Sequence, residues 1–70
     1  MKDDLQKIAA YLELCHAALI AQTKAAHGWP NPLLLPEPEN RHERKAVDLF
    51  TDELSALTRN EVPIQFRHRL

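Results

Sequence analysis

The sequence contains one cysteine, Cys15, and one glycine, Gly28, among its 70 residues. A single cysteine excludes an intrachain disulfide, and a single glycine excludes a glycine-rich phosphate-binding loop. Chains of this length rarely gain more than about 3–5 kcal/mol from one core, so they often depend on disulfides, metals or oligomerisation. Because the disulfide is excluded, we expect this chain to gain stability by association.

Neither sign of charge dominates, since nine Lys and Arg residues oppose ten Asp and Glu residues and the net charge is -1. The strong basic excess of many nucleic-acid-binding domains is therefore missing. No apolar run approaches the roughly 18 residues of a membrane span, and the initial Met-Lys-Asp-Asp is not typical of a secretory leader. We expect a cytoplasmic protein, because one cysteine and no leader suit a reducing compartment.

The residues that could carry chemistry do not form a known pattern. None of the four histidines is followed three or four positions later by a His, Cys, Asp or Glu residue, so the metalloprotease helix motif is missing. Cys15 lies in the middle of an apolar helical stripe, where a thiol packs in a core and lacks an orienting base. We therefore predict no metal site, no cofactor and no enzymatic activity.

Residues 3–27 predict one long helix that is apolar on two sides and ends at a left-handed Gly28. One stripe repeats at intervals of three and four residues, through Leu5, Ile8, Leu12, Cys15 and Leu19. A helix that is apolar nearly all round is normally buried on both sides, which a chain this short cannot achieve alone. We predict that the second face is a homodimer seam, formed by Ala10, Leu14, Ala18, Ala21 and Ala25.

The rest of the chain divides into a connector, a second helix and a tail. Four of the five prolines lie in residues 28–39, which predicts a stiff, extended connector. Residues 40–60 predict a one-sided amphipathic helix, with Asn40 and Glu43 as a capping box. Ile64 and Phe66 alternate with polar residues within 61–70. Since one short segment cannot form a sheet alone, we expect an extended C-terminal arm.

These elements predict an all-α fold. Two long helices joined by the connector would form an antiparallel helical hairpin, and their heptad-like spacing favours a shallow crossing angle. Two hairpins could then pair through the alanine-rich face into a four-helix bundle with two-fold symmetry.

Three groups of residues are candidates for binding a protein partner. The connector offers a tryptophan and three leucines, which could anchor a partner or cover the end of the bundle. Two basic clusters lie at the start of the second helix and at the C-terminus, and they could contact an acidic protein surface or nucleic-acid phosphates. The candidate residues are Trp29, Leu33, Leu34, Leu35, Arg41, His42, Arg44, Lys45, Phe66, Arg67 and Arg69.

The stretch from Leu54 to Asn60, followed by Pro63 and Phe66, resembles the C-terminal end of the Hha-type bacterial nucleoid modulators. The resemblance implies no site residues here, because residues 54–66 lack the tryptophan of that family. By size and plan, the chain resembles small helical proteins of phages and mobile elements that bind and inhibit a host protein.

We therefore expect a non-enzymatic homodimer that regulates or inhibits a partner protein. One alternative is a transcription or nucleoid modulator that uses the residues of 41–45 and 67–69. Another is a structural subunit of a larger complex.

Overall fold

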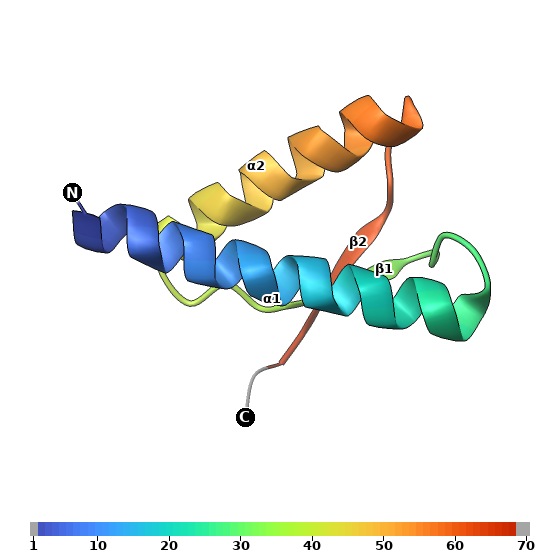
Figure 1. Ribbon diagram of the computed structural model, residues 1–70, viewed down its shortest axis with the longest axis horizontal. Coiled ribbons are helices and arrows are strands. Elements are labelled where there is room, and N and C mark those ends of the chain that lie inside the picture. The colour runs from blue at the N-terminus through green and yellow to red at the C-terminus, as the bar shows by residue number, and fades with distance from the viewer. Residues whose placement is uncertain (1, 69–70) are drawn as a thin grey trace.

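The computed structural model describes residues 2–68, which fold as a helix, a strand, a second helix and a second strand (Figure 1). The elements are α1 (Lys2–Ala26), β1 (Leu33–Pro36), α2 (Arg41–Thr58) and β2 (Ile64–Arg67). The strands form a two-stranded parallel sheet in which Leu33 lies opposite Ile64 and Leu35 lies opposite Phe66. The all-α prediction is wrong, because the connector and the C-terminal arm pair with each other. Helix α2 supplies the long crossover that a parallel pair requires.

The two helices run in the same direction, so the antiparallel hairpin and the four-helix bundle built from it are also wrong. Asp4 contacts His42 at the start of both helices, and the tilted rings of His16 and Phe50 meet farther along both. The reason is that β1 runs back along α1 and returns the chain to its N-terminal end (Figure 1). Helix α2 therefore begins where α1 begins.

The helix ends follow the sequence prediction in part. Asn40 caps α2 as predicted, since its side chain accepts a hydrogen bond of 3.0 Å from the Glu43 N–H. Glu43 completes the cap by accepting one of 2.8 Å from the Glu39 N–H. At the end of α1, however, the residue in the left-handed conformation is His27, with φ of 56°, and not the predicted Gly28.

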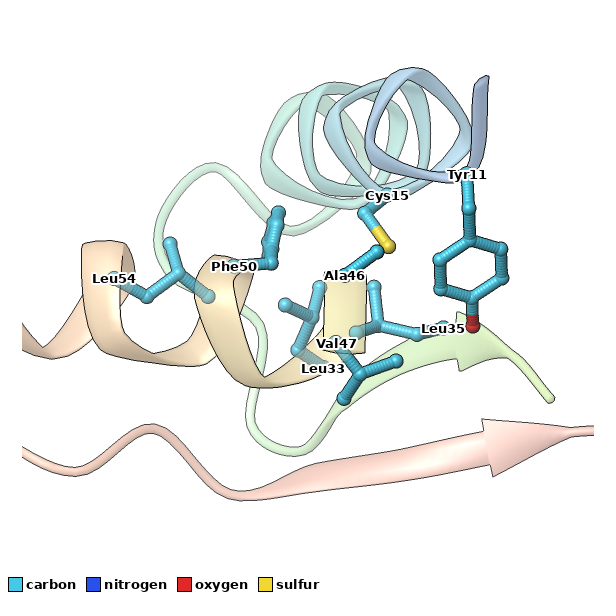
Figure 2. Close-up of a cluster of buried hydrophobic side chains, with 8 residues drawn as sticks. All are labelled: Tyr11, Cys15, Leu33, Leu35, Ala46, Val47, Phe50 and Leu54. Atoms are coloured by element: carbon cyan, nitrogen blue, oxygen red, sulfur yellow. The ribbon is translucent and has the colours of Figure 1, made fainter. Parts of the chain in front are cut away.

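The core lies where α1, β1 and α2 meet (Figure 2). Val47, Phe50 and Leu54 form the buried face of α2, and Cys15 points from α1 into the same cluster. Tyr11 was not predicted, although it lies one helical turn before Cys15 and so shares its face. The fully or nearly buried residues are Tyr11, Cys15, Leu33, Leu35, Ala46, Val47, Phe50 and Leu54.

Candidate protein-binding surfaces

The outer edge of β1 is covered by α1. The Gln22 side chain donates a hydrogen bond of 2.6 Å to the Leu34 carbonyl and accepts one of 2.9 Å from the Leu34 N–H. The Tyr11 hydroxyl donates to the Pro36 carbonyl, and proline has no N–H to satisfy. This edge therefore offers no free backbone groups to another strand.

Side chains alternate along β1, which separates a core face of the sheet from an outer face. Leu33 and Leu35 point into the core, so Leu34 and Pro36 lie on the outer face. There they meet the alanine side of α1 in an open hollow with a volume of about 350 Å³. We call it the alanine hollow, and it is lined by Ala18, Ala21, Gln22, Leu34, Pro36, Arg67 and His68.

The predicted dimer residues lie along one side of α1, and two of them line this hollow. Ala10, Ala21 and Ala25 are exposed, and Leu14 keeps 46% of its surface exposed. Ala18 differs from the others, because it is half-buried and packs against the core. The second apolar face therefore remains uncovered in the single chain, except at Ala18.

The apolar partner-binding candidates are separated by the fold. Leu33 and Leu35 belong to the core and are not accessible in the folded chain, whereas Trp29 is 54% exposed after α1. Leu34 lines the alanine hollow. Phe66 is 48% exposed and lies on the opposite face of the sheet, in a hollow with Pro38, Arg44, Val47 and Asp48.

The basic candidates are also divided among different surfaces. Arg41, His42 and Lys45 line a hollow together with Asp4, whose carboxylate is 2.8 Å from the His42 imidazole. Arg44 lies beside Phe66, and Arg67 lies at the alanine hollow. Arg69 lies outside the described residues. The described basic candidates therefore line three separate hollows.

Cys15 has the environment of a core thiol. Burial raises its pKa to about 11, and the negative charge of Glu43 adds to the rise. At neutral pH the thiol is protonated, which disfavours nucleophilic attack or metal ligation. Within residues 2–68, no group of three or more His, Cys, Asp and Glu side chains is arranged to hold a metal ion.

The sequence reasoning missed several residues that shape these surfaces. Gln22, Tyr11 and Pro36 close one edge of the sheet, and His68 joins Arg67 at the hollow, where its imidazole is 3.0 Å from the Glu37 carboxylate. None of these roles has a local sequence signature, because each depends on the position of β1 beside α1.

Comparison with protein-family models, curated proteins and solved structures finds no match for this chain. Within residues 2–68, neither helix has the length and apolar character needed to cross a membrane. The functional argument therefore depends on the surfaces themselves.

Proposed function

We propose that this chain is a small, non-enzymatic, homodimeric module that regulates or inhibits another protein by binding it. The alanine hollow is the surface that receives the partner, in the form of an amphipathic helix. The observation that carries the proposal is the uncovered apolar side of α1, which meets the outer face of the sheet at Leu34 and Pro36. Parallel sheets are normally covered on both faces. Here the outer face is covered only in part, since Leu34 and Pro36 are half-buried and Arg67 is exposed.

The chemistry of the hollow favours a helix with small apolar and acidic side chains. Ala18 and Ala21 allow the backbone of a second helix to approach closely, because their side chains are a single methyl group. Arg67 and His68 lie at the same hollow and complement a carboxylate on the incoming helix. This is the helix-in-groove mode of recognition, with polar contacts that fix its orientation.

Site-specific photo-cross-linking in a lysate of the source organism tests this proposal. A photoreactive amino acid at Ala21 should capture one protein species, while the same group at Glu13, on an exposed part of α1 outside the hollow, should not. A synthetic helix from the captured protein should bind the purified chain, and Arg67→Glu should weaken that binding about tenfold, or about 1.4 kcal/mol.

Two results would contradict the proposal. Equal capture from positions 21 and 13 would show that the hollow has no special affinity for a partner. Capture from position 21 of nothing but a second copy of the chain would instead place the dimer seam on this face, as the sequence analysis predicts.

A further inference from the structure

The outer edge of β2 is open, in contrast to the outer edge of β1. The Leu33 N–H donates to the Pro63 carbonyl and the Glu37 N–H donates to the Arg67 carbonyl, both at 2.9 Å. Backbone groups alternate in direction along a strand, so Ile64, Phe66 and His68 direct their N–H and C=O groups away from β1. Within residues 2–68, no group forms a hydrogen bond with these backbone atoms.

Pro63 does not protect this edge. Its carbonyl faces β1, so the N–H that proline lacks would also have faced β1 and not the open side. A two-stranded sheet is only marginally stable by itself, and an open edge is a template for a further strand. One edge is thus closed by three residues, while the other keeps its hydrogen-bonding groups available.

We propose that a second copy of this chain adds its β2 antiparallel to this edge, with Phe66 on the two-fold axis. The proposal rests on the homodimer of the proposed function and specifies where the two copies meet. In this register Phe66 exchanges both backbone hydrogen bonds with its symmetry mate, and Ile64 lies opposite His68 of the other copy. The product is a four-stranded sheet with a β1 strand at each outer edge.

The charges beside Phe66 favour a second copy over an unrelated strand. Arg44 and Asp48 lie one turn apart on α2, and both line the hollow that contains Phe66. Neither takes part in an ion pair within residues 2–68. A two-fold axis at Phe66 brings the two α2 helices together in opposite directions. Arg44 of each copy then faces Asp48 of the other copy across the axis, so the charges of this surface complement those of an identical surface.

The side chains of β2 suit the same register. Phe66 is half-exposed in the single chain, and across the axis it would pack against an identical ring. On the other face, Gln65 of each copy would lie opposite Arg67 of the other, which pairs a neutral acceptor with a cation. No like charges directly face each other in this arrangement.

Sedimentation of the wild-type chain and of semisynthetic and charge-exchanged variants tests the proposal. Methylation of the Phe66 backbone nitrogen removes the free-edge donor and leaves the side chain intact. It should weaken the dimer at least about tenfold, which corresponds to about 1.4 kcal/mol. Arg44→Asp and Asp48→Arg should each weaken the dimer, and the double exchange should restore it. Far-UV circular dichroism checks that each variant is folded.

Ala21→Glu serves as the control, because Ala21 is exposed on α1, and α1 covers the β1 edge of the sheet and not the open β2 edge. It should leave the dimer intact while it abolishes capture of the partner helix, and N-methylated Phe66 should do the reverse. The two proposals can therefore fail separately. A wild-type chain that stays monomeric at about one hundred micromolar, roughly a −5.5 kcal/mol limit, overturns the inference. A dimer that dissociates in the Ala21→Glu variant also overturns it, as does a dimer that persists after methylation of the Phe66 backbone nitrogen.

Discussion

The carboxamide of Gln22 forms two hydrogen bonds with the backbone of Leu34, one to its N–H and one to its carbonyl. Gln22 belongs to α1 and Leu34 to β1, so a helix side chain takes the place that a neighbouring strand would occupy. This pairing fixes the position of β1 along the axis of α1 and protects one edge of a very small sheet. The opposite edge has no such protection among the described residues, which is why the two edges have different proposed roles.

Replacement of Gln22 should therefore destabilise the fold. Gln22→Met keeps the length of the side chain but removes both hydrogen bonds and leaves the half-buried backbone groups of Leu34 unpaired. We expect the free energy of unfolding to fall by about 1–3 kcal/mol, measured by urea denaturation at a fixed protein concentration. Gln6→Met, at an exposed position of α1, is the matched control and should change stability by less than about 0.5 kcal/mol. Equal effects at both positions would contradict the structural role of Gln22.

Tyr11 should contribute through two separable interactions. Its ring is buried in the core (Figure 2). Its hydroxyl donates a hydrogen bond to the Pro36 carbonyl. Tyr11→Phe should remove the hydrogen bond alone and cost about 1 kcal/mol, whereas Tyr11→Ala should also leave a cavity and cost about 3–5 kcal/mol. Thermal or urea unfolding of both variants measures the two contributions. If Tyr11→Phe were as stable as the wild type, the contact with Pro36 would not matter to the fold.

The buried thiol of Cys15 should make the fold sensitive to alkaline pH. Its pKa rises from 9.0 to about 11 in the folded chain because of burial and, secondarily, the charge of Glu43. Between these values the unfolded chain loses the proton and the folded chain keeps it, so the free energy of unfolding falls as pH rises. A rise of two pKa units corresponds to about 2–3 kcal/mol of the free energy of unfolding. This contribution is fully present below pH 9 and is lost as the pH rises toward 11.

Cys15→Ala isolates this effect, because other groups also titrate in this range. The variant should be less stable than the wild type at neutral pH, since it leaves a small cavity in the core. The difference between the two chains should shrink as pH rises from 9 toward 11, measured by urea denaturation. A constant difference across that range would mean that the thiol has the same pKa in the folded chain as in the unfolded chain.

The helices were predictable from the sequence because their signals are local. Asn40 and Glu43 mark the start of α2, and the spacing of Val47, Phe50 and Leu54 marks its buried face. Extended segments were also predicted on both sides of α2. Their pairing was missed because neither segment is long enough to signal a sheet, although two short extended segments separated by a helix are typical of a parallel βαβ unit.

The surfaces were less predictable because they depend on that missed pairing. Once Leu33 and Leu35 enter the core, they cannot contact a partner, and Leu34 alone of the three leucines reaches the alanine hollow. The Ala18 and Ala21 side of α1 was identified from the helical wheel, but its position beside Arg67 was not, since those residues are far apart in sequence. Contacts of this kind follow from chain direction and not from local pattern.

The direction of α2 can be tested by the coupling between Asp4 and His42, whose side chains are 2.8 Å apart. A double-mutant cycle with Asp4→Asn and His42→Gln, measured at pH 5 and low ionic strength, should give a coupling energy of about 0.2–1 kcal/mol that decreases with added salt. Asp4 and Arg59 form the control pair, because Arg59 follows the far end of α2. In an antiparallel hairpin the pattern would reverse, with Asp4 coupled to Arg59 and not to His42. Coupling to His42 alone therefore requires that β1 return the chain to the start of α1 before α2 begins.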